Sequence, residues 1–413
     1  MTIALVCCQD EMEVAMTHGH SELGLKTFRA WRVGLFGIIL LGISGVAWAL
    51  VDRLGLVSEL HEPQAEHVFQ TELTTIEDPF ERFKRAFETG DELFETVFNA
   101  LDGSGANVGA GLRYTRVPRA DLSGPGEWAQ HVPARVTGPN AQACNACHRL
   151  PFDDGAGPAD ANVVRDPFHT ANLGRMITRN TPHLFAPGAV QRLAEEMTTE
   201  LQAIREAASA EACASRNRVT RELGAKGVNF GAITVIPGRL RRCPDRIVTG
   251  RIKGVGDDLI IRPFQWKGSD PTLRGFNREA AHRELGMQPV ELVGDDTDGD
   301  FDNVVNELTV GDLTALTVYL AAQPRPVTKT ELATFGLIDL TQAEMAAIDR
   351  GEQLFHEIGC NDCHRSTLLI DAPLFSEPSQ HPSYRDAVFP AGQDPLARGV
   401  DPSNPVMFDL TLD

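Results

Sequence analysis

Two short segments of the sequence combine the residue types that attach a haem covalently. Each has two cysteines three positions apart and a histidine directly after them: Cys144, Cys147 and His148 in the first, and Cys360, Cys363 and His364 in the second. In this pattern the thiols can bond the vinyl groups of a haem while the histidine binds the iron. A chain with 8 Cys and 12 His in 413 residues is expected to contain only about 0.004 such motifs by chance. The sequence therefore predicts two covalently attached c-type haems.

Two other uses of paired cysteines fit the sequence less well. A zinc ribbon places its two C-x-x-C pairs roughly 15 to 20 residues apart, whereas Cys147 and Cys360 are separated by about half of the chain. A thioredoxin-like dithiol does not require a histidine after its second cysteine. Haem attachment is therefore the favoured interpretation of both motifs.

Each motif follows a segment in which apolar residues recur at helical spacing. Residues that share one helical face are Gly90, Leu93, Phe94, Val97 and Phe98 before the first motif, and Gly351, Leu354, Phe355 and Ile358 before the second. Positions i, i+3, i+4 and i+7 lie on the same side of a helix. We expect helices over 79–101 and up to about 358, each packing against the porphyrin that follows it.

The N-terminal residues 1–50 predict export. Arg29 and Arg32 precede an apolar run over 33–47, and Ala47-Trp48-Ala49 offers small residues at the spacing that a signal peptidase recognises. The uncharged run continues to Val51, which is just long enough for a membrane-spanning helix. We expect a periplasmic protein whose first 50 residues are either a cleaved signal peptide or an inner-membrane anchor. Export agrees with covalent haem attachment.

The overall charge limits the class of partner. A net charge of −19 argues against nucleic acid, because binding to phosphates requires the opposite sign. An acidic surface suits a basic protein partner, and it also serves solubility alone.

The region between the two motifs predicts several structured segments. Gly- and Pro-rich residues 102–140 indicate an ordered loop over the haem edge, and Pro187 is well placed to begin a helix. Runs of β-forming residues within 228–265 predict a small hairpin or sheet. Two further thiols, Cys213 and Cys243, are expected to form a disulfide in an oxidising compartment, the alternative being two buried free cysteines.

An acidic segment after the sheet follows the register of a calcium loop. Asp298, Asp300 and Asp302 occupy positions 1, 3 and 5, while Asn303 replaces the usual glycine at position 6. Thr309 stands at position 12, where a bidentate glutamate is expected. The sequence predicts a weak calcium site, the alternative being an acidic turn that caps a helix over 311–322.

Several stretches together resemble the bacterial di-haem cytochrome c peroxidase superfamily, and most closely its di-haem oxidoreductase (putative peroxidase) branch. They lie between about residues 80 and 364 and read GDELFETVFNALDG, TGPNAQACNACH, RNTPHLFAPGAV, IIRPFQWKGSDPTLRGF, DGDFDNVVNELT and GEQLFHEIGCNDCH. The resemblance implies a mainly α protein with cytochrome c-like haem domains at 78–210 and 341–413, and a β-containing insert at 211–326. Members of the superfamily continue further beyond the second motif than the 49 residues that follow His364 here, so we expect a truncated second domain.

The resemblance also implies a reaction. One haem would reduce hydrogen peroxide, with electrons passed through the other haem from a small cytochrome or cupredoxin. The alternatives are a non-enzymatic di-haem electron carrier and an enzyme that oxidises a protein or an organic substrate. Long loops and an acidic helix flank the first motif, so we expect the haem at His148 to react and the haem at His364 to store electrons.

Peroxide reduction needs a proton shuttle and an electron relay. We favour Glu196 over Glu195 as the shuttle, the alternative for both being solvated helix charges. Trp266 is the predicted relay between the haems, unless it is simply a core tryptophan.

The second axial ligands are predicted less directly. His169 is the expected sixth ligand of the first iron, with His183 as the alternative. Met407 is the only methionine after the second motif and is a candidate ligand of the second iron.

Overall fold

The computed structural model describes most of the chain after residue 61. The described ranges are 2–3, 62–109, 111–115, 130–135, 137–151, 154–157, 163–165, 172–238, 243–244, 246–362 and 364–411. Residues 1–5 and 64–413 form one compact unit, which is described below, and residues 6–63 form another. The predicted signal or anchor segment lies almost entirely outside the described ranges, within which no helix combines the length and the apolar character needed to cross a membrane.

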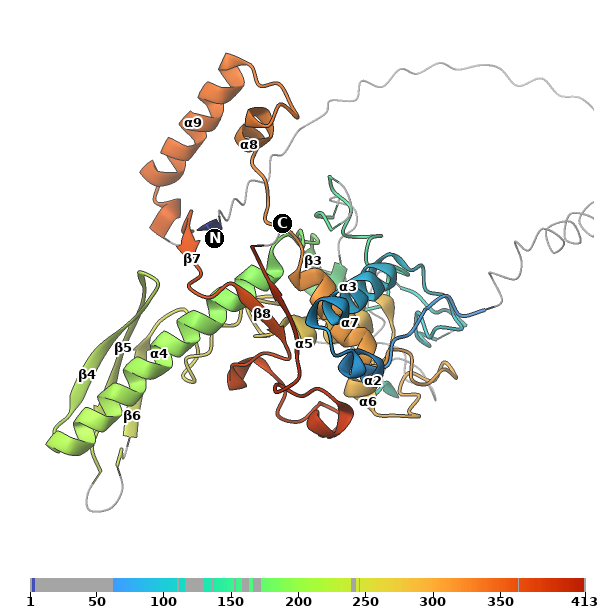
Figure 1. Ribbon diagram of the computed structural model, residues 1–413, viewed down its shortest axis with the longest axis horizontal. Coiled ribbons are helices and arrows are strands. Elements are labelled where there is room, and N and C mark those ends of the chain that lie inside the picture. Colours follow the sequence, from blue (N-terminus) through green and yellow to red (C-terminus); the bar gives the residue numbers. More distant parts are fainter. Residues whose placement is uncertain are drawn as a thin grey trace, which may run out of the picture. The chain divides into compact units, whose positions relative to one another are not determined.

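Two helices form the centre of the core (Figure 1). α3 (Pro79–Glu95) begins at Asp78, whose carboxylate accepts hydrogen bonds from the amides of Phe80 and Glu81. α7 (Val310–Ala321) is buried along its whole length. A Cβ at Gly90 of α3 would lie 2.2 Å from the carbonyl oxygen of Ala315, so only glycine permits this close approach of the helices.

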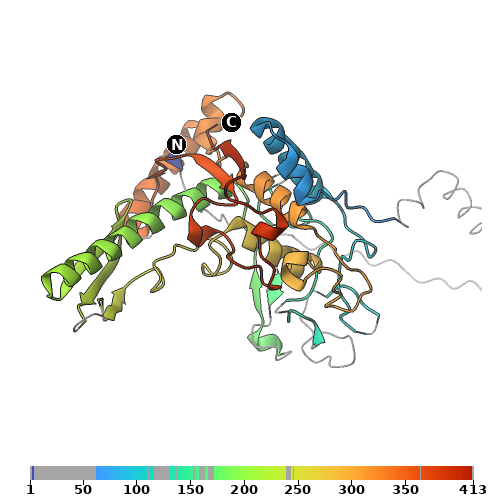
Figure 2. The ribbon, with the colours of Figure 1, turned by 60° about the horizontal axis from the view of Figure 1, so that its bottom comes forward.

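The predicted helix from Pro187 is confirmed as α4 (Pro187–Ser215), and a sheet packs against its second half (Figure 2). The antiparallel sheet has the order β4 (Val219–Ala225), β5 (Val228–Ile236) and β6 (Arg246–Ile252). Strand β5 confirms the first predicted β run, whereas the second run, 258–266, contains no strand. The predicted disulfide between Cys213 and Cys243 is confirmed and joins the end of α4 to the loop before β6.

Shorter elements complete the layer around α3 and α7. They are α2 (Gln70–Thr75), the pair β2 (Val163–Arg165) and β3 (Ile177–Arg179), η2 (Leu173–Arg175), α5 (Leu273–Ala280), the π-helical η3 (Ala281–Leu285) and α6 (Val290–Val293). The predicted helix over 311–322 is confirmed as α7. Thr309 caps α7 through the amide of Asp312, whose own side chain accepts from the Thr309 amide.

The residues after the second motif return to the core of the first. β8 (Leu374–Glu377) pairs with β9 (Val406–Asp409) and contacts α4 and α7, while η5 (Pro382–Tyr384) and η6 (Leu396–Arg398) lie between them in the chain. Phe408 of β9 stacks near Phe83 of α3, with ring centroids 4.7 Å apart. Buried Arg274 donates to Glu377 of β8 at 2.8 Å. This segment is therefore held by both apolar packing and ion pairs.

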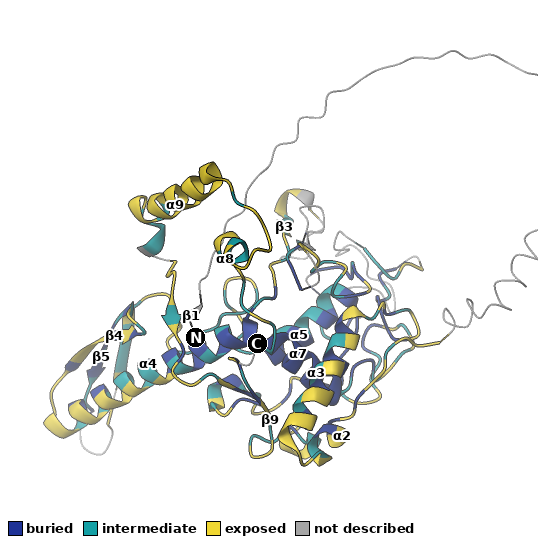
Figure 3. Cartoon of the chain, turned by 45° about the horizontal axis from the view of Figure 1, so that its top comes forward, coloured by how far each residue is buried: buried dark blue, intermediate teal, exposed yellow. Residues whose placement is uncertain are grey.

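The helices before the second motif pack differently. α8 (Lys329–Thr334) and α9 (Gln342–Glu357) contain no buried residue, as the exposed colouring in Figure 3 shows. Phe335, Leu337 and Ile358 are 69%, 70% and 72% exposed. After η4 (Cys360–Asp362), β7 (Leu368–Leu369) pairs with β1 (Thr2–Ile3).

The predicted fold class, a mainly α protein built from two cytochrome c-like domains with an insert, is wrong. Only 37% of the described residues are helical and 14% are in strands, without a cytochrome pattern. The reason is that periodicity identifies the apolar face of a helix but not the element that covers it. Here α3 packs on α7, which was expected in the insert, and on β9, which was expected in the second domain. The predicted domain boundaries stay predictions.

Candidate haem sites and acidic cluster

The first motif forms one tight turn at the edge of the core. The amides of Cys147 and His148 both donate to the carbonyl of Cys144 at 3.1 Å. Both cysteines are free thiols, half-buried against the apolar core. Burial raises the pKa of Cys144 to about 12, so the group is a neutral thiol near neutral pH. The motif thus presents two reduced cysteines in one turn, and thioether formation with a haem requires cysteines that are not disulfide-bonded.

His148 has the character of a metal ligand. Its Nδ1 is buried and has no hydrogen-bond partner among the described residues. Burial lowers the pKa of the imidazole to about 4. Backbone hydrogen bonds at Pro182 and Gly155 oppose this shift in pKa, and nearby His183 adds to it. A buried polar atom without a partner is rare in folded proteins, and iron is bound by the neutral imidazole. These residues therefore fit a covalently attached haem.

An aromatic side chain of α3 lies beside this histidine and packs in turn on one from α7. The rings of Phe94 and His148 have centroids 6.1 Å apart, and those of Phe94 and Tyr319 are 5.5 Å apart. The Tyr319 hydroxyl donates to Asp154 at 2.8 Å, and burial together with this carboxylate raises the pKa of the phenol. The predicted helix before the first motif is present, although it ends at Glu95 rather than near 101.

The second motif lies on a surface segment. The amide of His364 donates to the carbonyl of Cys360 at 2.9 Å, and the His364 ring lies 6.2 Å from that of Phe355. Cys360 is a half-buried free thiol and His364 is exposed, whereas Cys363 lies outside the described residues. Neighbouring apolar side chains are exposed. Leu354 on α9 is 40% exposed, and Ile358, the residue that follows α9, is 72% exposed. A porphyrin attached here would cover them, so the segment fits a haem.

The two predicted proton-shuttle residues are both held by other groups. The Glu196 carboxylate accepts from the backbone amides of Asp371 and Ala372 and pairs with Lys226 at 2.8 Å. The pKa of Glu196 is lowered; burial acts to raise it, but the bonds from Lys226 and from the two amides outweigh that effect. This carboxylate therefore fastens the chain that follows the second motif to α4.

Glu195 is buried one position earlier on the same helix. Its carboxylate accepts from Gln191 at 3.1 Å and from Ser379 at 2.8 Å, and pairs with Arg192. Both of its oxygens are thus occupied within the described structure. Nothing in the sequence indicated that Ser379 would bond to Glu195, because the two residues are 184 positions apart.

The predicted relay residue lies on the surface. Trp266 is 39% exposed, which excludes the alternative of a core tryptophan. The Arg179 guanidinium lies 4.6 Å and the Lys267 ammonium 4.9 Å from its ring centroid. Its role as a relay stays a prediction.

The predicted sixth ligands of the two irons differ in their surroundings. His169 lies outside the described residues. His183 is close enough to His148 to lower its pKa, and its ring stacks on Phe185 with centroids 5.3 Å apart. Met407 lies on β9, where it is 38% exposed and pairs with Ser376. Strand β9 packs on α3 through Phe408, so the strand belongs to the core around the first motif, while the Met407 side chain is exposed.

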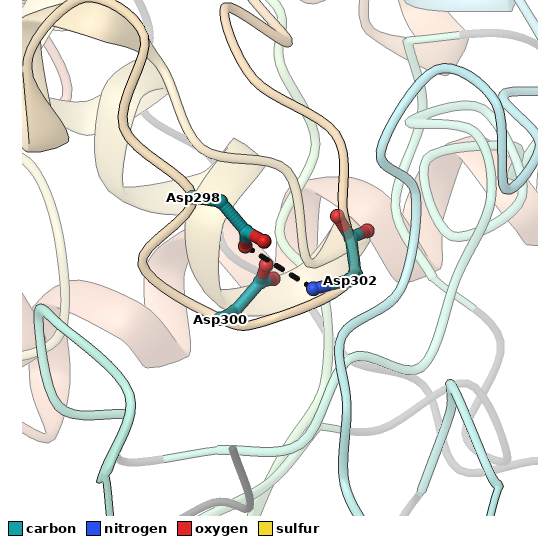
Figure 4. Close-up of side chains that lie close together, drawn as sticks. All are labelled: Asp298, Asp300 and Asp302. Atoms are coloured by element: carbon teal, nitrogen blue, oxygen red, sulfur yellow. Dashed lines mark hydrogen bonds between the residues drawn. The ribbon is translucent and has the colours of Figure 1, made fainter.

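The three aspartates of the predicted calcium loop converge, as Figure 4 shows. Asp298, Asp300 and Asp302 each offer an oxygen, and these oxygens lie within 4.8 Å of one another. Asp298 also accepts from the amides of Asp302 and Asn303, which fixes the turn. Burial raises the pKa of Asp300 to about 7, with the other two carboxylates acting in the same direction and Arg135 opposing them.

A fourth carboxylate, close enough to interact with Asp300 and Asp302, was missed from the sequence. Glu307 is 1% exposed, and its Oε1 has no partner in the described structure. Burial and the charges of Asp300 and Asp302 raise its pKa well above the usual range. Glu307 occupies position 10 of the loop register rather than 12, so the calcium-loop template did not identify it.

Two arginines neutralise part of this charge. Arg113 pairs with Asp302 at 2.6 Å and Arg135 with Asp300 at 3.3 Å. The raised pKa values of Asp300 and Glu307 show that the two guanidinium groups do not balance four ionised carboxylates. A divalent cation would supply the two further positive charges that full ionisation needs. Oxygen donors of this kind suit a hard divalent cation.

Comparisons with known proteins add no relative. Protein-family models, curated proteins and solved structures were compared with the chain, and none matches. The functional argument consequently depends on the motifs in the sequence and on the geometry of the sites.

Proposed function

We propose that the protein is an exported di-haem c-type oxidoreductase that reduces hydrogen peroxide. The observation that supports this most strongly is the first motif, where two free thiols lie in one turn with an imidazole that has an unpartnered buried nitrogen. The second motif repeats the residue types at Cys360 and His364. Peroxide reduction takes two electrons, and two irons in one chain supply a reaction site and an electron store.

The residues of the chain have separate tasks in this proposal. Cys144 and Cys147 hold one porphyrin, and His148 binds its iron as a neutral imidazole. When bound, the haem supplies the redox chemistry. Phe94 lies beside His148 and packs on Tyr319, so water is excluded from that side and the ligand stays neutral.

A specific observation also supports a second candidate function, a non-enzymatic electron-transfer cytochrome. Peroxide cleavage needs a group that moves a proton between the two oxygens. Glu195 and Glu196 were the predicted shuttles, and the carboxylate oxygens of both are already engaged by described neighbours. Without another proton donor, both irons would serve only electron transfer.

Spectroscopy of the haem-loaded protein tests these alternatives. Mass spectrometry after denaturation should show two retained haems. The oxidised protein should have a high-spin band from an iron with an open position, and that band should change on addition of peroxide while peroxide is consumed. Two low-spin irons that do not respond to peroxide would identify the electron carrier, and fewer than two retained haems would contradict the di-haem proposal itself.

We propose in addition that the acidic cluster binds calcium. The convergence of Asp298, Asp300 and Asp302 supports this, as does the unpartnered buried oxygen of Glu307. The cluster lies on the loop that precedes α7, so a bound cation would stabilise the position of that helix.

A further inference from the structure

The basic residues of this acidic protein are concentrated in one segment. Residues 215–253 contain ten of the 38 lysines and arginines but only two of the 57 aspartates and glutamates. The segment therefore carries a net charge of +8 in a chain whose net charge is −19. It includes strands β4 to β6, which we call the basic sheet, although Arg239, Arg241 and Arg242 of its ten cations lie outside the described residues.

One face of the basic sheet is free of the core. Val219, Leu223, Ile233 and Val235 point towards α4 and are buried. Because side chains alternate along a strand, the neighbours of these residues point the other way. The opposite face carries four exposed cations against the single carboxylate of Glu222: Arg218, Arg246, Arg251 and Lys253.

Most of these cations are available to a partner. Arg251 approaches Glu222 at 3.4 Å, a pair in which both side chains are about two-thirds exposed. Arg218, Arg246 and Lys253 form no ion pair with any described residue. Surface pairs of this kind are weak, so the face keeps a positive potential that an acidic surface can meet.

The lack of exposed large apolar side chains on this face, among the described residues, limits the kind of partner. Ile236 and Val248, which pair with Arg246 and Thr234, are only partly exposed there. No large hydrophobic residue is exposed among the described residues from 172 to 265. A stable dimer buries apolar area, and membrane insertion also requires it. Weak electron-transfer complexes, in contrast, rely on charge, which increases the association rate and suppresses wrong partners.

The basic sheet touches the segment that carries the second motif. The guanidinium of Arg365, the residue after His364, donates to the carbonyl of Gly227 in the β4–β5 turn at 3.3 Å. Lys226 in the same turn pairs with Asp371. Strand β6 ends at Ile252 beside this turn, since the amide of Lys253 donates to Phe230. Arg251, Lys253 and Arg365 thus lie at the end of the sheet that contacts the second motif.

We propose that the basic sheet docks a small acidic redox protein and delivers its electrons to the haem at His364. This inference rests on the proposed function for its redox part, but the docking itself depends only on charge. The partner contributes carboxylates that face Arg251 and Lys253, and the complex is short-lived and sensitive to salt.

The test uses two probes that differ only in surface charge: cytochrome c, which is basic, and the same protein with its lysines succinylated, which is acidic. Binding to the haem-loaded protein is measured by calorimetry at low and high salt, and electron transfer by stopped-flow absorbance. The test variant is Arg251→Glu/Lys253→Glu. The control, Lys84→Glu/Arg85→Glu, makes the same charge change at exposed positions of α3.

We expect the succinylated probe to bind the native chain and to lose about tenfold or more in affinity with the test variant or with added salt. The control should stay within about twofold, and Arg251→Lys/Lys253→Arg should retain binding. Equal loss in both charge-reversed variants would overturn the inference, as would salt-sensitive self-association of the native chain that the test variant abolishes. Charge-dependent binding without electron transfer would instead uphold the docking and contradict the proposed function. Thermal unfolding of each variant confirms that it is folded.

Discussion

At the level of single residues, some polar side chains in the described part of the chain have a buried atom that is free to bind a ligand, whereas others already bind neighbouring groups of the protein. Among the described residues, His148 and Glu307 each have a buried atom without a hydrogen-bond partner. The Glu196 carboxylate, in contrast, binds Lys226 and two backbone amides. Sequence spacing singled out His148 as a candidate iron ligand because the residues of a haem-attachment motif are contiguous, and that role stays a prediction. It did not identify Glu307, and it did not show that Glu196 is committed, because both depend on contacts between distant parts of the chain.

Calcium should stabilise the protein through the acidic cluster. Its removal by a chelator should lower the melting temperature, because the three converging aspartates and nearby Glu307 then have only Arg113 and Arg135, among the described residues, as partners of opposite charge. Replacing Glu307 with Gln should reduce the calcium-induced rise in melting temperature, and so should Asp300→Asn. Glu77→Gln, an exposed change away from the cluster, is the control. A melting temperature that is the same with calcium and with chelator would contradict the site.

Glu196 should act as a fastening for the segment after the second motif. Glu196→Ala leaves two backbone amides without their acceptor and removes one of the partners of Lys226, so we expect a loss of about 1–3 kcal/mol in the free energy of unfolding. The pH profile of the peroxide reaction should not change. Denaturant unfolding measures the first quantity and stopped-flow kinetics the second. A large fall in peroxide rate in a fully stable variant would restore Glu196 as the proton shuttle.

At the scale of elements, the packing of α3 against α7 forms the centre of the core. The amphipathic pattern over 79–101 and the helix over 311–322 were predictable, because both patterns are local. Their contact was not, since it depends on Gly90 fitting against Ala315. Gly90→Ala should destabilise the protein by about 1–3 kcal/mol through overpacking. Gly250→Ala on β6, where a Cβ meets no atom within 4 Å, should leave stability nearly unchanged, and chemical denaturation compares the two.

The N-terminal end of α7 should make stability depend on pH. The His67 Nδ1 lies 2.7 Å from the buried Asp312 carboxylate, and this hydrogen bond raises the pKa of His67 above 6.5. A raised folded-state pKa gives stability that is complete below 6.5 and is lost as the pH rises through the folded value. The unfolding free energy should therefore fall above neutral pH, and His67→Gln should flatten this fall. An unchanged pH profile in the variant would show that another group is responsible.

At the scale of the whole molecule, the first motif lies against the apolar core, whereas the second lies on a surface segment. Residues 370–411 pack around α3 and α7 rather than around α9, while α8 and α9 bury no side chain. Sequence patterns indicated two similar haem domains because the two motifs and their preceding helices look alike. They differ in what covers them, which is set by long-range packing.

This asymmetry predicts different tasks for the two haems. His148 is a half-buried neutral imidazole in an aromatic setting, and His364 is exposed beside the basic sheet. His148→Gly should abolish peroxide turnover. His364→Gly should preserve a single reaction with peroxide at the first haem but prevent sustained oxidation of the donor, because electrons no longer enter the chain. Stopped-flow absorbance measures the single reaction, and steady-state donor oxidation measures turnover. If the His148 variant reacts with peroxide at the native rate, the haem at His364 is the reactive one and the assignment of tasks is reversed.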